Sequence, residues 1–281
     1  MDQLQSSSMR VFLTGHKGKI GTSIHRLLLK EGHEIVGFDI LDGNDILDAN
    51  AVERAMADCD SVIHLATLLG HDQPNDLKLA SGVVGTWNVL QAAEKHQVRR
   101  VVYYSSVNAM GLFQGEDKPD FLPIDETHPC RPGRAYGTSK YLSEHTCRLF
   151  TQRTGIATVC FRPPAVWTEK DIQHIKEARA QKPEFEWTPF WEYGCFIHVE
   201  DLAHATLCAL TCPDPGHIPL LVTAADITSA ALTSRELVDK LLPEVEWRGG
   251  PEYDADPYRS LVDCQRAQDI LGWSPRYRWR P

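Results

Sequence analysis

Tyr136 and Lys140 are four residues apart, the spacing that places two side chains on one face of a helix. A tyrosine hydroxyl has a pKa of roughly 10 and is therefore a poor base at neutral pH. A lysine ammonium beside it stabilises the phenolate and lowers that pKa, so the pair could exchange a proton with a substrate hydroxyl. Alone, the same spacing also describes an ordinary surface pair, so the neighbouring motifs must decide between the two readings.

Ser105 and Ser106 supply a second reactive group at the end of a predicted strand over 100–105. In doubly wound parallel sheets, ligands bind at the carboxyl ends of the strands. A serine hydroxyl there can hydrogen-bond the substrate oxygen while the tyrosine exchanges its proton. The alternative interpretation is that the two serines simply terminate the strand.

A glycine-rich loop follows the first predicted strand, with Gly15, Gly18 and Gly21 leading into a predicted helix over 20–30. Such a loop makes a tight turn, lets the backbone approach a pyrophosphate and places the phosphates at a helix N-terminus. Asp39 ends the second predicted strand, where a carboxylate can bind the ribose hydroxyls of the adenosine. The alternative is a glycine turn with an unrelated surface aspartate; strand, glycines, helix, strand and acid in this order favour a dinucleotide site.

Asp39 also bears on which dinucleotide is bound. Its carboxylate would repel a 2′-phosphate, which favours NAD over NADP. His16 and Lys17 are an opposing signal, because basic side chains in the loop could hold that phosphate.

The elements that must position these residues alternate along the first half of the chain. Short β-branched runs predict strands, and amphipathic segments between them predict helices, so we expect an α/β fold with a Rossmann-type doubly wound parallel sheet. The predicted strands cover 10–14, 34–39, 61–65, 100–105 and 157–161, and the predicted helices cover 20–30, 49–57, 75–96 and 135–154.

Beyond residue 162 the alternation breaks up into strands at 194–199 and 218–222 and helices at 200–211, 234–242 and 263–272. We expect a disordered leader over 1–8 and an NAD-binding Rossmann domain over 9–164. The mixed region 165–281 is expected to complete the fold and to form a small, interleaved C-terminal substrate lobe.

Composition excludes several classes of function. The 281 residues carry a formal net charge of −9, which makes nucleic acid or an anionic membrane an improbable partner. The eight cysteines are scattered without a Cys-x-x-Cys pair, so no metal site is predicted and a reducing, cytoplasmic location is expected. No apolar run reaches membrane-spanning length, and the N-terminus lacks the pattern of a secretory signal.

Taken together, the motifs resemble the extended short-chain dehydrogenase/reductase family, the NAD-dependent epimerase/dehydratase group. The resemblance covers nearly the whole chain and is carried by TGHKGKIG (14–21), Asp39, Asp45-Ile46, His64-Leu65-Ala66, GTWNVLQAA (85–93), VVYYSSVNAMG (101–111), YGTSK (136–140), Arg162-Pro163-Pro164, FIHVEDLA (196–203) and LGWSP (271–275).

That resemblance implies a catalytic trio of Ser106, Tyr136 and Lys140, with Ser106 chosen over Ser105 by counting back from Gly111. It departs at Gly82, where the family commonly has asparagine, and this puts in doubt a supporting hydrogen bond near the cofactor. It also implies a possible homodimer through the helices at 75–96 and 135–154. The residues implied to bind the cofactor are Gly15, Lys17, Gly18, Lys19, Ile20, Gly21, Asp39, Asp45, Ile46, Leu65, Ala66, Tyr136, Lys140 and the backbone of Arg162 and Pro163.

The reaction is left open among three hypotheses: a dehydrogenase of a free sugar, sugar acid or polyol; a nucleotide-sugar epimerase or dehydratase that retains NAD; and a catalytically silent NAD-binding regulator. The first is favoured because the C-terminal region is short, and between residues 165 and 262 it offers few arginines for a diphosphate, namely Arg179, Arg235, Arg248 and Arg259. The intact trio argues against the third.

The stretch after the serines and Arg162-Pro163-Pro164 look similar to uronate-dehydrogenase-like members, although Val107 and Asn108 differ from their usual residues. The predicted substrate residues are Thr67, Ser106, Asn108 and Tyr136; Thr67 and Asn108 could equally be loop-capping residues. Four aromatic residues, Trp187, Phe190, Trp191 and Tyr193, could cover a sugar or pack the lobe.

Overall fold

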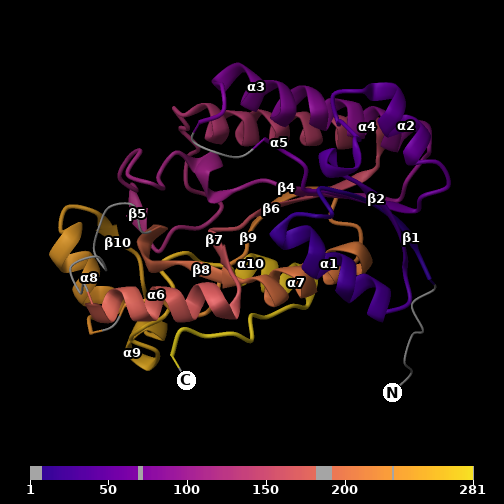
Figure 1. The fold of residues 1–281 in the computed structure, drawn as a ribbon. Coiled ribbons are helices and arrows are strands. Elements are labelled where there is room, and N and C mark those ends of the chain that lie inside the picture. Colours follow the sequence, from indigo (N-terminus) through magenta and orange to yellow (C-terminus); the bar gives the residue numbers. More distant parts are fainter. Residues whose placement is uncertain (1–7, 69–71, 182–191, 230, 281) are drawn as a thin grey trace.

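A six-stranded, all-parallel sheet forms the centre of the computed structural model, which describes residues 8–68, 72–181, 192–229 and 231–280 (Figure 1). The strand order is β2-β1-β3-β4-β6-β9, so the chain reverses its direction of progress across the sheet between β1 and β3. The strands are β1 (Arg10–Thr14), β2 (Glu34–Phe38), β3 (Ser61–His64), β4 (Arg100–Tyr104), β6 (Ala157–Arg162) and β9 (His217–Leu221).

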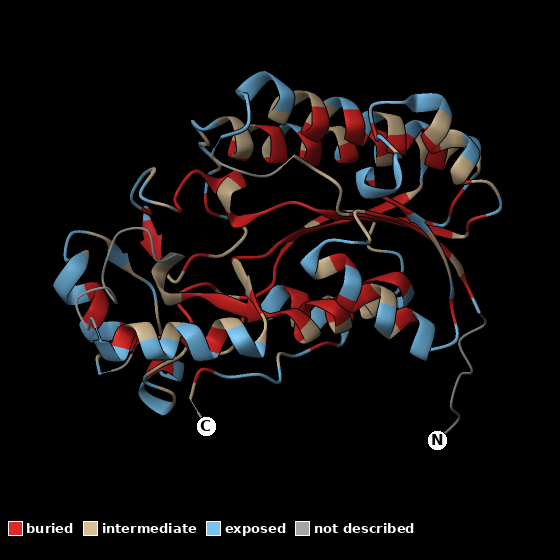
Figure 2. Ribbon diagram, viewed as in Figure 1, coloured by how far each residue is buried: buried red, intermediate tan, exposed pale blue. Residues whose placement is uncertain are grey.

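Helices cover both faces of this sheet (Figure 1), because the strand side chains on both faces are apolar and must be shielded from water. On one face lie α1 (Lys19–Lys30), α7 (Val199–Thr211) and α10 (Gln265–Leu271), and on the other α2 (Ala49–Ala55), α4 (Gly85–Lys95) and α5 (Ala135–Thr154). Two buried apolar clusters result, one on each side, and Figure 2 shows the buried residues concentrated along the strands and the inward helix faces. The predicted Rossmann-type α/β fold is confirmed.

The prediction of one continuous helix over 75–96 is wrong in one respect, because a π-helical turn interrupts the segment. It consists of α3 (Asn75–Leu79), a wider π-helical turn η2 (Ala80–Val84) and α4. Gly82 lies in that turn and passes Ser139 of α5 so closely that a Cβ on residue 82 would stand 2.7 Å from the Ser139 Cβ. One wider turn hardly changes the spacing of apolar residues along the sequence, which remains near 3.6 residues. The sequence pattern therefore predicted a continuous helix.

The small lobe lies beyond the carboxyl ends of β4, β6 and β9, on the left in Figure 1. It contains two short parallel pairs, β7 with β8 and β5 with β10, and three helices. The bounds are β5 (Phe121–Leu122), β7 (Ala165–Trp167), β8 (Phe196–His198), β10 (Glu246–Trp247), α6 (Glu169–Gln181), α8 (Ser234–Leu241) and α9 (Glu252–Ala255).

Residues from both halves of the sequence form the core of this lobe. Met110 and Phe113 from the segment after β4 pack in one buried cluster with Ile227 and Leu237 from the C-terminal region. Conversely, α7, β9 and α10 of the C-terminal region complete the layers around the main sheet. The chain between β4 and α5 therefore links the sheet edge directly to the small lobe.

Candidate active site

The residues predicted to do chemistry follow the carboxyl ends of neighbouring parallel strands, so the fold brings them to one edge of the sheet. In strand order across the sheet these are Asp39 after β2, Gly15 after β1, Leu65 after β3, Ser105 and Ser106 after β4, and Pro163 after β6.

The loop after β1 is closed so tightly that it requires glycine at two positions. Gly15 has a φ of +72°, in the left-handed region, and a Cβ there would stand 3.0 Å from the Ala66 amide nitrogen. A Cβ on Gly21 would stand only 2.2 Å from the Gly15 carbonyl oxygen. Gly18 is the N-cap of α1 and offers no side chain to cap it, so the positive end of the helix remains available to an anion. The cradle fits the pyrophosphate of a dinucleotide.

Asp39 is buried beside this loop and accepts two backbone hydrogen bonds, from Lys17 N at 3.0 Å and Leu41 N at 3.0 Å. The two basic side chains of the loop are engaged with another carboxylate. Lys17 Nζ donates to Asp42 Oδ1, and His16 Nε2 lies 3.4 Å from Asp42 Oδ2. Lys17 and His16, the two basic side chains that could hold a 2′-phosphate, are therefore both paired with Asp42. This pairing agrees with NAD rather than NADP.

Lys19 and Ile20 contribute differently from the glycines. Lys19 Nζ donates to Asp171 Oδ2 at 3.0 Å, so its side chain reaches across to α6 of the small lobe. Ile20 packs against the apolar cluster between the sheet and α1. At these positions it is the backbone, at the start of α1, that can face a cofactor.

Asp45 and Ile46, which the resemblance implies as cofactor-binding residues, lie between β2 and α2. Ile46 is buried, and its backbone oxygen accepts a hydrogen bond from Asn88 Nδ2 at 3.0 Å. A Cβ on Gly85 would stand 2.6 Å from Ile46 Cδ1, so that glycine lets α4 approach. Asp45 Oδ1 accepts from Leu47 N at 2.9 Å and shapes this loop.

A buried hydrogen-bond chain, for which no role was predicted, supports the strand ends. Thr14 Oγ1 accepts from the amides of Leu65 and Ala66 and lies 2.7 Å from His64 Nδ1, while His64 Nε2 lies 3.1 Å from Thr86 Oγ1. Burial lowers the pKa of His64 to about 3, so the ring is neutral, with one nitrogen accepting and the other donating. The chain fixes Leu65 and Ala66 next to the glycine loop.

Lys140 is held beneath the predicted reaction centre. It is 2% exposed, and its Nζ donates to the Tyr104 carbonyl oxygen at 2.7 Å. The same nitrogen lies 5.7 Å from the centre of the Tyr136 ring, so the two residues of the predicted pair do face each other. Burial lowers the pKa of Lys140 to about 7, and the nearby Glu144 carboxylate opposes that shift.

The elements that carry Ser106 and Tyr136 pack against each other. Ser106 is the N-cap of a short 3₁₀ turn η3 (Val107–Met110), and its Oγ accepts from Asn108 N at 3.1 Å. A Cβ on Gly137 would stand 2.4 Å from the Asn108 carbonyl oxygen, so glycine lets the first turn of α5 pack directly on this turn. Ser106 Oγ uses a lone pair in the Asn108 hydrogen bond, which leaves its hydroxyl proton to donate.

Ser105 points the other way, into a buried ion pair that sequence reasoning missed. Its Oγ donates to Glu144 Oε1 at 2.5 Å, and Glu144 receives two further hydrogen bonds from Arg162, Nε to Oε1 at 2.9 Å and Nη2 to Oε2 at 2.6 Å. The Arg162 side chain thus faces the interior, and it is the backbone of Pro163 that lies at the site, where its oxygen accepts from Val107 N at 3.2 Å. This arrangement agrees with the choice of Ser106 over Ser105.

Two predicted substrate residues lie at the same edge. Thr67, shortly after β3, is partly exposed, yet its Oγ1 is buried and has no hydrogen-bond partner among the described residues. A buried hydroxyl without a partner is uncommon and could be satisfied by a ligand. Asn108 is partly exposed beside Ser106.

Of the four aromatic residues predicted to cover a sugar or pack the lobe, Trp187, Phe190 and Trp191 lie outside the described residues. Tyr193 packs inside the lobe, where its hydroxyl donates to the Leu112 oxygen at 2.9 Å. Packing is therefore the reading that the structure supports for Tyr193.

The arginines that could have bound a diphosphate are mostly occupied. Arg179 is buried, and its Nη2 donates to Thr228 Oγ1 at 3.0 Å. Arg235 pairs with Asp239 at 2.7 Å, and Arg248 pairs with Glu246 at 2.8 Å. For Arg259 the structure shows a backbone bridge with Asp226.

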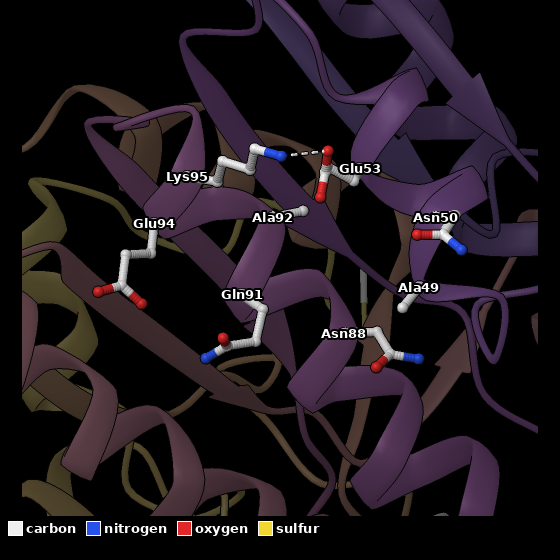
Figure 3. Close-up of a pocket in the computed structure, with 8 residues that line it drawn as sticks. All are labelled: Ala49, Asn50, Glu53, Asn88, Gln91, Ala92, Glu94 and Lys95. Atoms are coloured by element: carbon white, nitrogen blue, oxygen red, sulfur yellow. Dashed lines mark hydrogen bonds and ion pairs between the residues drawn. The ribbon is translucent and has the colours of Figure 1, made fainter.

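A surface pocket of about 330 Å³ lies apart from this edge, between α2 and α4 (Figure 3). Its ionic side chains are paired: Glu53 with Lys95 at 2.5 Å, and Glu94 with Arg153 outside the pocket. It contains none of the residues predicted to react.

The described residues were also compared with the requirements of a metal site and of a membrane-spanning helix. Within the described ranges, no three His, Cys, Asp or Glu side chains come together so that they could hold a metal ion. No described helix is both long and apolar enough to cross a membrane.

The fold and the strand-edge residues define a Rossmann-fold enzyme of the dinucleotide-dependent oxidoreductase type. A family model described as the NAD-dependent epimerase/dehydratase family matches residues 11–222, and the chain belongs to this family. NAD is therefore its cofactor, and the resemblance to the extended short-chain dehydrogenases/reductases is confirmed.

Among curated relatives, a putative UDP-glucose 4-epimerase of Methanocaldococcus jannaschii is 28% identical, covering 94% of this chain and 93% of its own. A uronate dehydrogenase of Pseudomonas syringae pv. tomato is 26% identical, covering 76% of this chain and 74% of its own. A solved UDP-glucose 4-epimerase of Thermotoga maritima superposes with a TM-score of 0.70 at 19% identity, covering 96% of this chain and 94% of that one. These relatives span both leading hypotheses.

Proposed function

We propose that the protein is an NAD-dependent dehydrogenase that oxidises a hydroxyl of a free sugar, a sugar acid or a similar polyol. The observation that carries the proposal is that Arg179 is buried, while Arg235 and Arg248 are each paired with an acid close in the sequence. Three of the four arginines between residues 165 and 262 are thus held by their own neighbours, which supports a substrate without a diphosphate.

Gly15, Gly18 and Gly21 would hold the pyrophosphate of NAD at the start of α1, and Asp39 would bind the adenosine ribose. Bound NAD supplies a hydride acceptor at the edge of the sheet. The backbone around Pro163 would lie near the nicotinamide, and Lys140 would hold the remaining ribose through its ammonium.

The chain's own residues would handle the proton. Tyr136, as phenolate, accepts the proton of the reacting hydroxyl while the carbon gives up its hydride. Lys140 stabilises that phenolate through its positive charge. Ser106 donates its hydroxyl proton in a hydrogen bond to the oxygen that becomes the carbonyl. Asn108 and Thr67, whose hydroxyl has no partner within the described part of the chain, bind other hydroxyls of the substrate.

A nucleotide-sugar epimerase or dehydratase is the second candidate, supported by the relative that covers 94% of this chain and bears the name UDP-glucose 4-epimerase. In such enzymes the hydride returns to the substrate, so the cofactor is regenerated in each cycle. This candidate predicts NAD that stays with the purified protein and no net change in nicotinamide absorbance.

One experiment separates the two candidates. The purified protein is incubated with NAD, and separately with NADP, against aldoses, uronates and nucleotide sugars, while the absorbance of reduced nicotinamide is followed. The proposal expects NAD reduction with a free sugar or sugar acid. Retained NAD together with no response to any free sugar would overturn it.

We also propose a homodimer through α3, α4 and α5, which lie together on one side of the sheet (Figure 1). These helices and the η2 turn between α3 and α4 expose apolar side chains, Leu77, Val84, Trp87, Leu142 and Leu149, each 42–58% exposed. An apolar face of this kind is often covered by a partner. Sedimentation should give twice the chain mass, Trp87→Glu with Leu149→Glu should give the monomer, and a monomeric parent protein at micromolar concentration would contradict the dimer.

A further inference from the structure

Two charged side chains of α5 are buried one helical turn apart. Lys140 is 2% exposed and Glu144 is 4% exposed. Removing a charge from water is costly unless a partner or hydrogen bonds compensate it. The way each charge is compensated shows what the second residue does for the first.

Glu144 is held in place by the side chains of Arg162 and Ser105. Arg162 binds both of its carboxylate oxygens, at 2.9 and 2.6 Å, and Ser105 donates to Oε1 at 2.5 Å. Arg162 is itself only 5% exposed. The carboxylate therefore has one fixed position, set by β6 and by the end of β4.

Lys140 has weaker compensation. Its Nζ donates to a neutral acceptor, the Tyr104 carbonyl oxygen. Among the described groups that act on it electrostatically, Glu144 is the only carboxylate. The others are the rings of Tyr103, at 5.0 Å, and of Tyr136, the thiols of Cys147 and Cys160, and the imidazole of His64.

We propose that Glu144 is a positioning residue for the Tyr136–Lys140 site: fixed by Arg162 and Ser105, its carboxylate supplies the counter-charge that keeps Lys140 an ammonium. The role assigned to this ammonium rests on the function proposed above. The juxtaposition of Glu144 with Lys140 does not depend on the identity of the substrate.

The direction of the effect follows from the charges. Burial already lowers the pKa of Lys140 to about 7, and Glu144 is the largest influence that raises it. If Glu144 is made neutral, Lys140 loses the anion that acts on it most strongly, while the buried Arg162 cation remains. Lys140 then loses its proton at a lower pH, and the support for the Tyr136 phenolate is lost over the same range.

The test is a titration of Lys140 itself, in protein carrying isotope-labelled lysine side chains and observed by NMR without substrate or cofactor. Comparison with Lys140→Met identifies the signal. In Glu144→Gln, the midpoint for Lys140 should fall by about one unit or more. Glu144→Asp keeps the charge and should restore most of the midpoint.

Glu126→Gln is the matched control. Glu126 is also a mostly buried carboxylate near Arg162, and its Oε1 accepts from Leu221 N at 2.7 Å, but it is not among the groups that act on Lys140. The same chemical change there should leave the Lys140 midpoint in place. A fall of equal size in Glu126→Gln would show that general disturbance, rather than the Glu144 charge, is being measured, and would overturn the proposal.

An unchanged Lys140 midpoint in folded Glu144→Gln would reduce Glu144 to a structural ion-pair partner and overturn the proposal. If that variant does not fold, Glu144→Gln combined with Arg162→Gln removes the ion pair as a unit and avoids a lone buried cation. A downward shift is expected there as well, because the Glu144 charge is again absent, and a midpoint that does not fall is equally decisive. Because no substrate is used, failure of this proposal is distinct from failure of the proposed dehydrogenase activity, which the sugar panel reports.

Discussion

Gly82 and Ser139 touch where the π turn before α4 crosses the helix that carries Tyr136 and Lys140. A Cβ on residue 82 would stand 2.7 Å from both Cβ and Oγ of Ser139. The Gly82 oxygen also accepts a hydrogen bond from Ser143 Oγ at 2.9 Å. The position at which this chain departs from its family is thus a close contact that admits no side chain.

This contact predicts that Gly82→Ala destabilises the protein. Either α5 or the π turn must shift to admit the methyl group, at a cost of about 1–3 kcal/mol in the free energy of unfolding. Urea unfolding measures the change. Adding Ser139→Gly, which removes the clashing atoms, should recover part of the loss; if it recovers none, the contact is not the cause.

Asp42 predicts a change in cofactor preference. Asp42→Asn leaves Lys17 and His16 without their carboxylate partner, so both become available to a 2′-phosphate. The ratio of NADP affinity to NAD affinity should rise by about twofold to fivefold, the usual size of a partly exposed charge interaction. Fluorescence titration with each cofactor measures it.

The control for this prediction is Asp48→Asn, at the N-cap of α2, where the carboxylate accepts from Ala51 N at 3.0 Å. Loss of an acid there should leave the affinity ratio unchanged. An equal rise in both variants would point to net charge rather than to the pairing with Lys17 and His16.

Much of this architecture follows from local sequence. The strands begin at the predicted residues 10, 34, 61, 100 and 157, because each is a short apolar run between turn residues. α5 begins and ends as predicted; its C-cap Gly155 has a φ of +76°, a conformation that favours glycine. The Tyr136–Lys140 pair is equally local, because a helix alone sets its spacing.

The buried polar contacts could not be predicted in the same way. His64 meets partners 50 residues before it and 22 residues after it, and Arg162 reaches Glu144 only when β6 lies beside α5. In the sequence, Glu144 is the single acid of α5 and gives no sign that it is buried. Arg162 was assigned to the cofactor by resemblance, which located its backbone but not its side chain.

The lowered pKa of buried His64 should make the free energy of unfolding decrease as the pH falls below neutral. Its pKa is about 3 in the folded protein and ordinarily 6.5, so below about pH 6.5 the unfolded chain binds a proton that the folded protein does not. Its contribution is therefore present above that pH and is lost progressively on acidification. His64→Gln, uncharged but able to donate and accept, should be less stable near neutral pH by about 1–3 kcal/mol.

The difference in free energy of unfolding between the parent protein and His64→Gln should narrow as the pH falls towards about 4.5. Only in the parent does unfolding release a histidine that binds a proton, and this favours the unfolded state increasingly at lower pH. Urea unfolding at several pH values gives both curves. Parallel curves would mean that His64 titrates normally and is not buried as described.

Lys140 predicts a conflict between stability and activity. Its pKa is about 7 in the folded protein and ordinarily 10.5, so between these values the unfolded chain binds more protons and stability rises with pH. Below pH 7 Lys140 is charged in the folded protein, and the burial of this ammonium then lowers the free energy of unfolding by its full amount. Lys140→Met removes that cost, leaves the Glu144–Arg162 ion pair intact, and should raise the free energy of unfolding at about pH 6 by roughly 1–4 kcal/mol.

The increase in the free energy of unfolding that Lys140→Met brings should become smaller by about 1–3 kcal/mol between about pH 6 and about pH 9. Over this range Lys140 of the parent loses its proton in the folded state, so the parent no longer buries a charge. Turnover, by contrast, should fall by about a hundredfold or more, as in Tyr136→Phe, because the phenolate loses its support. Tyr136→Phe removes no buried charge and should therefore lower turnover without the pH-dependent gain in stability. A Lys140→Met protein that is less stable than its parent at both pH values would show that the lysine is held in place by favourable contacts, and not retained for its chemistry at a cost to the fold.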